Sequence, residues 1–450
     1  MSEKSEKIYD GITLVSDDLI DEAQAKKKKR RAWKWLSSAA AVILAVTGVA
    51  AIFTRNPSEV FAIAEAVYPE ESAVRVDREA YSEGMADFLK QSIPTFLGGE
   101  AGQNRVYSPA NLYIALSMLA DVTDGESRGQ ILSLLGSDSL AVQRAKANAL
   151  WNGEYYNREE GSGWCTLANS LWLNENVNFV PETMNTLAES YYTSSYRGDP
   201  ASESFNAAFR DWLNEQTGGM LKEQVDGLEM NARTVLEMVS TVYFRGRWVD
   251  EFDPEDTKPA VFHAPDGDRT CDFMNERTDG SYFWGERFSA VAKSFTNARS
   301  MLFVLPDEGT TPEELLEDGE FLSFLSDVSW KWEQNEYLIV NLSVPKFDVT
   351  SDTDLTAGMK SLGITDVFDP EASDFTPMTT DTDVFLSRAT HAARVTIDEE
   401  GCTAASYVDF GIDATGGPRD EIVDFTLDRP FLFVIRRYDV PLFVGIVNQP

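Results

Sequence analysis

The sequence predicts an α+β fold, in which helices and strands occupy separate parts of the chain. Apolar residues recur at helical spacing in the first half, for example at 85–96, whereas the second half is dominated by the alternating and continuously apolar runs typical of strands. Because the two kinds of segment do not alternate along the chain, the α+β class is favoured over α/β. The chain is 43% hydrophobic and 11% aromatic, which is enough for a sizeable core.

Three segments in the first half carry helical patterns. The apolar side chains of residues 85–96 fall on one face of a helix. Residues 126–135 are followed by Gly136, a residue suited to the left-handed conformation that closes a helix. A third amphipathic face, at 205–213, precedes a Gly-Gly pair at 218–219 that stops it. We therefore expect helices in these three ranges.

Strand patterns dominate the second half. Residues 235–244 form an almost continuous apolar run, as expected of a strand that is buried on both faces. The alternation of apolar and polar residues at 338–344 and 393–397 indicates strands with one buried face. Further apolar runs lie at 301–306, 431–435 and 442–447.

The composition excludes several classes of function. A net charge of −35 disfavours nucleic acid as a partner, because phosphates need Lys and Arg to neutralise them. The three cysteines, Cys165, Cys271 and Cys402, are too few and too far apart for a disulfide framework or a zinc site. The sequence has no Gly-x-Ser-x-Gly, His-Glu-x-x-His or P-loop motif. We therefore expect a protein that is not an enzyme and that needs no metal or cofactor.

The N-terminus has the pattern of a membrane anchor. A basic run at 26–31 precedes an uncharged apolar stretch at 36–53, which Arg55 closes. The length of this stretch is near the lower limit of the roughly 17–25 residues that span a bilayer, and the two tryptophans before it suit the membrane interface. Because basic residues remain on the cytoplasmic side, we expect the N-terminus inside the cell and the remainder outside.

These features divide the chain into a cytoplasmic basic segment at 1–31, a transmembrane helix at 32–55, a stalk at 56–76 and one folded domain at 77–450. The expected location is the cell membrane, with a single span and the domain extracellular. Secretion after signal cleavage is the alternative, because a small-x-small sequence occurs at 62–64. The apolar stretch is longer than an ordinary signal core and more than thirty residues precede it, which favours the anchor.

Several blocks of the folded domain match one family, and they do so in the family's order. They lie at 106–112, 124–131, 241–248, 345–347, 362–368, 391–401, 429–433 and 447–450. Each block alone is a weak signal. The ordered set, which extends over more than three hundred residues, resembles the serpin family.

The resemblance implies a fold of three β-sheets, eight or nine helices and an exposed reactive loop near the C-terminus. It also implies inhibition of a serine protease, or of a cysteine protease, by a suicide-substrate mechanism. The protease cleaves the loop and becomes covalently attached, and the loop then inserts as a strand into the large sheet. A non-inhibitory serpin that acts as a binding or chaperone protein is the alternative. We expect a monomer whose partners are the protease and the membrane.

The predicted loop has the pattern of a strand with one buried face. Its odd-numbered residues from 403 to 413 are largely polar or tolerant of solvent. Gly401 before this segment and the glycines after it favour a hinge and a loop tip. A strand that is already part of the native sheet would show the same alternation. The even-numbered residues, all small or apolar, are Cys402, Ala404, Ser406, Val408, Phe410 and Ile412.

The resemblance also implies roles for particular residues. His391 corresponds to a histidine that forms a hydrogen bond beneath the opening point of the large sheet, and Ser108 to a partner in that region. Where many serpins have asparagine on the central strand, this chain has Ser240. The hinge departs from the pattern of inhibitory serpins at Cys402, where they usually have Thr or Ser, and at Thr403, where they usually have an acidic residue. No inward proline or charged residue is present that would block insertion. The hinge residues are Glu400, Gly401, Cys402, Thr403, Ala404, Ala405 and Ser406.

Two counts give different positions for the reactive bond. The family's spacing after the hinge glycine gives Thr415-Gly416, which implies an elastase-like or subtilisin-like protease that accepts a small residue. The spacing before Pro430 gives Arg419-Asp420 and implies a trypsin-like protease. An inserted strand reaches roughly 3.3 Å per residue, so residues added before the bond loosen the pull on the protease. This favours Thr415-Gly416, with Arg419-Asp420 as the alternative.

Overall fold

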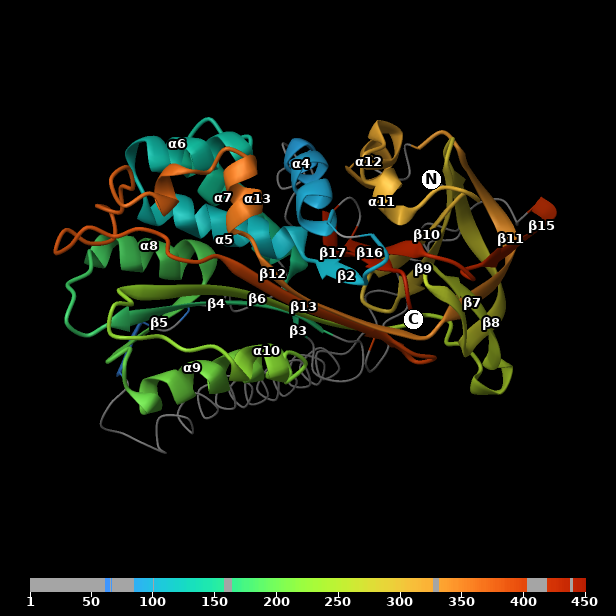
Figure 1. Ribbon diagram of the computed structural model, residues 1–450, viewed down its shortest axis with the longest axis horizontal. Coiled ribbons are helices and arrows are strands. Elements are labelled where there is room, and N and C mark those ends of the chain that lie inside the picture. The colour runs from blue at the N-terminus through green and yellow to red at the C-terminus, as the bar shows by residue number, and fades with distance from the viewer. Residues whose placement is uncertain are drawn as a thin grey trace, which may run out of the picture. The chain divides into compact units, whose positions relative to one another are not determined.

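The computed structural model describes residues 61–64, 66, 85–99, 101–157, 164–326, 332–402, 419–437 and 440–450 of the chain, all within one compact unit (Figure 1). The predicted cytoplasmic segment at 1–31 and the predicted transmembrane helix at 32–55 lie outside these residues. Across the part of the chain that is described, no helix is long and apolar enough to cross a membrane.

All three predicted helices are present. α4 (Met85–Leu97) buries its predicted apolar face, and α9 (Glu203–Gln216) includes the range 205–213. α6 (Gly125–Leu134) is followed by Gly136 with a φ of +60°, the left-handed conformation expected there. The remaining α-helices among the described residues are α5 (Pro109–Val122), α7 (Leu140–Glu154), α8 (Pro181–Tyr191), α10 (Lys222–Asp226), α11 (Pro312–Leu315), α12 (Gly319–Ser326) and α13 (Thr356–Ser361), with two 3-10 helices, η1 (Pro254–Asp256) and η3 (Asp366–Phe368).

The strands form three sheets, as the resemblance implies. The first sheet has the order β1 (Phe61–Ala64), β5 (Thr193–Gly198), β4 (Trp164–Asn174), β6 (Leu236–Arg247) and β14 (Gly401–Cys402), with β3 (Tyr156–Asn157) paired to β4. The second has the order β15 (Arg419–Thr426), β11 (Asn335–Pro345), β8 (Gly267–Trp284), β9 (Phe288–Phe295), β10 (Arg299–Pro306), β16 (Phe431–Arg437), β17 (Val440–Val447) and β2 (Arg105–Tyr107), with β7 (Lys258–Ala264) paired to β8. The third pairs β12 (Phe347–Asp354) with β13 (Thr390–Ile397).

Helices cover both faces of the first sheet. Figure 1 shows α9 and α10 on one side of β4 and β6, and α5 and α7 on the other. Nearly every side chain of α5 is buried, because this helix lies between the sheet, α7 and the C-terminal strand β17. Its mostly apolar sequence is what a helix in the interior of a protein requires.

The first and third sheets do not join between β6 and β13. No ladder of hydrogen bonds links these two strands among the described residues, and β6 pairs instead with the two-residue strand β14 at its C-terminal end. β13 continues through a tight turn directly into β14. The large sheet that the resemblance implies is therefore divided at this line.

The strand β1 lies within the range 56–76, where the sequence predicts a stalk. It pairs antiparallel with β5, with Phe61 opposite Arg197 and Ala62 opposite Tyr196. The backbone N–H of Ala66 donates a hydrogen bond to the Ser194 Oγ at 3.3 Å. β1 thereby covers the edge of β5, whose backbone groups would otherwise be open to pairing with another chain.

Candidate functional site

The turn between β13 and β14 reverses the chain at the end of the divided sheet. Asp398 and Gly401 exchange backbone hydrogen bonds across it, and the Asp398 carboxylate accepts from the backbone N–H groups of Glu400 and Gly401 at 3.0 and 3.1 Å. Gly401 has a φ of +143°, and a Cβ at this position would lie 2.4 Å from the carbonyl oxygen of Gly246. Only glycine fits here.

Residues at the end of β6 and beyond hold this turn in place. The Trp248 indole donates to the carbonyl of Asp398 at 3.1 Å, and its backbone N–H donates to the carbonyl of Glu400 at 3.1 Å. The Glu399 carboxylate accepts from the Thr257 hydroxyl at 2.7 Å and pairs with Lys346 at 2.6 Å. In the sequence Trp248 and Lys346 stand out only as parts of family motifs, and neither was predicted to contact the hinge.

Cys402 is the first hinge residue that enters the divided sheet. It pairs with Gly246 of β6, is 6% exposed, and its thiol donates to the carbonyl of Thr396 on β13 at 3.1 Å. Burial raises the pKa of this thiol to about 12, so it stays protonated and unreactive near neutral pH. Its small size and its burial suit the inward position predicted for it.

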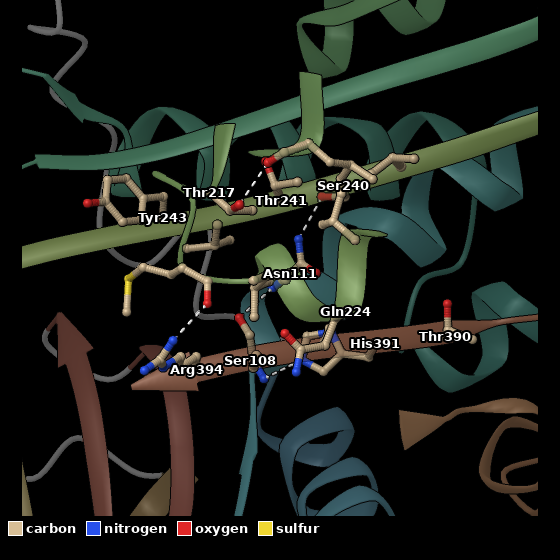
Figure 2. Close-up of a pocket in the computed structure, with 18 of the residues that line it drawn as sticks. Ser108, Asn111, Thr217, Gln224, Ser240, Thr241, Tyr243, Thr390, His391 and Arg394 are labelled. Atoms are coloured by element: carbon tan, nitrogen blue, oxygen red, sulfur yellow. Dashed lines mark hydrogen bonds between the residues drawn. The ribbon is translucent and has the colours of Figure 1, made fainter. Parts of the chain in front are cut away.

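A cleft of about 290 Å³ continues from Cys402 between β6 and β13. α5 contributes residues to one of its walls, and α9 and α10 contribute to another. Figure 2 shows the polar side chains of these elements around it, with His391 on β13 and Ser240 on β6. A space bounded by two unjoined strands has the form that one further strand would fill.

His391 lies at the cleft and is held in its neutral form. It is 8% exposed, and burial lowers its pKa from 6.5 to about 4. The Nε2 atom accepts a hydrogen bond from the backbone N–H of Ser108 at 3.0 Å, which assigns the proton to Nδ1. The Ser108 hydroxyl in turn donates to the carbonyl of Leu442 at 2.6 Å and, as the N-cap of α5, accepts from the Asn111 N–H at 3.3 Å.

Ser240 has its partner on α5. The Asn111 side-chain amide donates to the Ser240 hydroxyl at 2.9 Å, so the amide is supplied by the helix and the hydroxyl by the strand (Figure 2). The strand lacks the asparagine of many serpins, as predicted from the sequence, but Asn111 was not predicted as its complement. The position of Asn111, three residues after Ser108, was the available signal, because residues three apart in the first turn of a helix face the same region.

The described residues contain no group of three or more His, Cys, Asp or Glu side chains that could hold a metal ion.

A sequence profile with the description Serpin (serine protease inhibitor) matches residues 86–450. The chain belongs to the serpin family.

Relatives of this serpin come from distant organisms. An uncharacterized serpin-like protein of Methanosarcina acetivorans is 27% identical over 369 residues, which cover 77% of this chain and 82% of that protein. The leukocyte elastase inhibitor of Sus scrofa is 29% identical over 360 residues, covering 77% of this chain and 93% of the relative. The crystal structure of the thermophilic serpin tengpin in its native state has a TM-score of 0.73 at 23% identity, covering 87% of this chain and 100% of tengpin.

The structure brings together part of the residue set expected for a serpin. Ser108, Ser240 and His391 line one cleft, and Gly401 and Cys402 lie at its end. Thr403, Ala404, Ala405 and Ser406 and the bond Thr415-Gly416 lie outside the described residues. Arg419 and Asp420, the alternative bond, are the first two residues of β15, in which Arg419 pairs with Leu338.

The neutral state of His391 predicts a pH dependence of stability. Because its folded pKa is about 4 and its unfolded pKa about 6.5, the unfolded state binds the proton first, and stability is lost as the pH falls from 6.5 towards 4. The loss attributable to this residue reaches about 3 kcal/mol at pH 4. In His391→Gln the decrease in melting temperature between pH 7 and pH 5 should be smaller than in the parent serpin. An identical decrease in both proteins would contradict the assignment.

The Asn111–Ser240 hydrogen bond predicts a compensating pair of substitutions. Ser240→Ala leaves a partly buried amide without this partner, which costs about 1–3 kcal/mol and should lower the melting temperature by several degrees. The exchange Asn111→Ser with Ser240→Asn restores one amide and one hydroxyl and should recover most of the loss. Melting temperatures of both single variants and the double variant measure the coupling. Additive effects in the double variant would show that the two side chains do not act as a pair.

Proposed function

We propose that this serpin inhibits serine-type proteases as a suicide substrate, with its loop entering the cleft between β6 and β13. The observation that carries the proposal is the pairing of Cys402 with Gly246. It gives the loop a direction, antiparallel to β6. It also gives a register, in which each step forward along the loop is matched by one step back along β6 from Gly246. Continuing this register takes the loop along the cleft.

The register agrees with the alternation in the loop sequence. It brings Ala404 opposite Phe244 and, at the far end, Ile412 opposite Leu236, which is the first residue of β6. Ile412 is also the last residue of the inward apolar set. The inward apolar set of the loop, read from the sequence, therefore ends at the residue that would lie opposite the end of β6, which is read from the fold.

The register with β13, on the other side of the cleft, points the same loop side chains inward. The Asp398–Gly401 pair sets a second antiparallel register, with β13, in which Ala404 meets Val395 and Val408 meets His391. Val395 and His391 are buried residues of β13. Val408 would then lie between Ser240 and His391, in the middle of the cleft that these side chains line.

Insertion has a sufficient driving force. Each of Val408, Phe410 and Ile412 contributes roughly 1.5–3 kcal/mol on full burial, or about 5–9 kcal/mol together. The inserted strand also supplies backbone partners to two strand edges that face each other without a common ladder. Loop cleavage frees the segment to travel the length of β6, and an attached protease would move with it.

For the reactive bond we favour Thr415-Gly416. The protease serine would attack the Thr415 carbonyl, form an ester with it, and release Gly416 as the new amino terminus of the C-terminal fragment. In the alternative bond, Arg419-Asp420, Arg419 begins β15 and pairs with Leu338, and the register with β11 shifts between this pair and the next, Ile339 with Ile422. The pairing of Arg419 ties one residue of that bond to the sheet, whereas a protease binds its substrate as an extended, unpaired chain. A threonine before the bond suits an elastase-like or subtilisin-like enzyme, and a cysteine protease of similar preference is compatible.

The test is incubation of the serpin with pancreatic elastase and with subtilisin, followed by electrophoresis in SDS. The proposal predicts a band that contains both proteins and survives denaturation. A non-inhibitory serpin would give only cleaved chains, or none.

We also propose that residues 32–55 anchor the serpin in the cell membrane, with 1–31 cytoplasmic and the domain at 77–450 outside. The basic run and the uncharged stretch after it support this topology. In cells that produce the full chain with a C-terminal tag, the tag should fractionate with membranes and should be removed when protease is added to intact cells. Protection of the tag in intact cells contradicts the topology, and a tag found only in the medium indicates signal cleavage.

A further inference from the structure

An exposed apolar surface lies on the second sheet, where β15 begins. Tyr337 of β11 is 44% exposed and Ile422 of β15 is 48% exposed. Ile339, partly exposed, lies directly opposite Ile422 and two residues after Tyr337 on the same face of β11. We call these three residues the β11–β15 face.

The neighbouring pairs show that this face points to solvent. Asn341 and Asp424, the next outward pair along the two strands, form a side-chain hydrogen bond at 2.7 Å on the exposed side. Leu342 and Phe425, the pair after them, point to the opposite side and are buried. An apolar residue exposed singly needs no explanation, whereas these three residues lie side by side on one sheet face.

The chain connects this face closely to the reactive bond. Only Gly416, Gly417 and Pro418 separate Thr415 from the first residue of β15, so at roughly 3.3 Å per residue the bond lies within about 13 Å of Arg419. Arg419 pairs with Leu338, the residue between Tyr337 and Ile339. A protease interface of standard size covers about 800 Å² on each partner, a patch roughly 30 Å across, which is wider than the distance of about 13 Å between the bond and Arg419.

We propose that the β11–β15 face is a second docking surface for the protease, which contacts the rim of the enzyme on the leaving-group side of its active-site cleft. The inference rests on the proposed function, because it takes the occupant to be the enzyme that cleaves the loop. Tyrosine is well suited to such a contact, because it supplies a large rigid apolar area with a polar tip. Asp279 and Arg277, both exposed on β8 opposite Ile339 and Asn341, put one charge of each sign beside this face, so the complementary rim is apolar with polar groups of both signs beside it.

The test measures docking and loop cleavage separately. Binding is measured with elastase and subtilisin whose catalytic serine is replaced by alanine, and the second-order rate of loop cleavage with the active enzymes. The variants are Tyr337→Ala and Ile422→Ser, and the control is Phe385→Ala. Phe385 is an aromatic residue of matched exposure, 45%, and the next residue, Leu386, bonds to η3, far from β15 in the sequence.

Tyr337→Ala should weaken binding and slow loop cleavage by about tenfold, the effect of a typical interface hot spot. Ile422→Ser should act in the same direction, and Phe385→Ala should change neither quantity. The fraction of cleavage events that end in covalent complex should stay constant. Unchanged binding and cleavage in Tyr337→Ala and Ile422→Ser, or no measurable binding by the parent serpin, overturn the docking surface. Cleavage without covalent complex in the parent protein would instead reject the inhibitory function, while the docking effect would still be read from the cleavage rates.

Discussion

Replacement of Ala404 by glutamate is expected to convert the inhibitor into an ordinary substrate. If the loop enters the cleft in the proposed register, position 404 would face inward between Phe244 and Val395, which are both buried. A carboxylate there would have to enter the core without a partner, at a cost of several kcal/mol. Because insertion then becomes slower than hydrolysis of the ester, the number of serpin molecules consumed per inhibited protease should rise by about tenfold or more.

The matched control is the same substitution one residue later. In the same register position 405 would face outward between Tyr243 and Arg394, an exposed cation that pairs with Asp348 at 2.5 Å. Ala405→Glu should therefore leave the yield of covalent complex within about twofold of the parent value, because a solvated charge near a cation costs little. Densitometry of complex and cleaved chain on SDS gels measures both variants. Equal losses at 404 and 405, or no loss at either, would contradict the inward and outward assignment.

Cleavage of the loop should raise the thermal stability of the serpin strongly. The released segment would bury Val408, Phe410 and Ile412 and join β6 to β13 in one continuous sheet. A gain of about 5–9 kcal/mol from these side chains alone corresponds to a rise in melting temperature on the order of 10 °C or more. The measurement is a thermal scan before and after limited proteolysis. Cleaved Ala404→Glu should gain less, and a parent protein that melts at the same temperature in both forms would show that the loop does not insert.

Local patterns in the sequence were sufficient for the individual elements. The apolar positions of α4, the glycine after α6 and the alternation in β13 each depend on near neighbours, and each prediction is confirmed. Ser108, Ser240 and His391 line one cleft. Their hydrogen bonds could be predicted only in part, since the family pattern assigns the amide to the strand.

The features that the sequence did not reveal depend on contacts between distant segments. Asn111 reaches Ser240 across 129 positions of the chain, and no local pattern indicates that pairing. The division between β6 and β13 is a missing ladder between two strands that each have ordinary strand sequences. β1 is four residues long and follows an apolar stretch, so its sequence alone does not indicate a strand. Its pairing with β5 depends on the edge that the folded sheet presents. Ten α-helices lie among the described residues, beside the eight or nine that the resemblance implied, and α10 and α11, of five and four residues, are the shortest of them.

The most direct test of the account is to identify both products of one inhibition reaction. The serpin is incubated with pancreatic elastase and with subtilisin, the mixture is resolved in SDS, and the released C-terminal peptide is identified by mass spectrometry. We expect an SDS-stable complex that retains the chain up to Thr415, together with a free peptide that begins at Gly416. A complex accompanied by a peptide that begins at Asp420 would move the reactive bond to Arg419. Complete cleavage of the loop with no covalent complex would contradict inhibition by strand insertion.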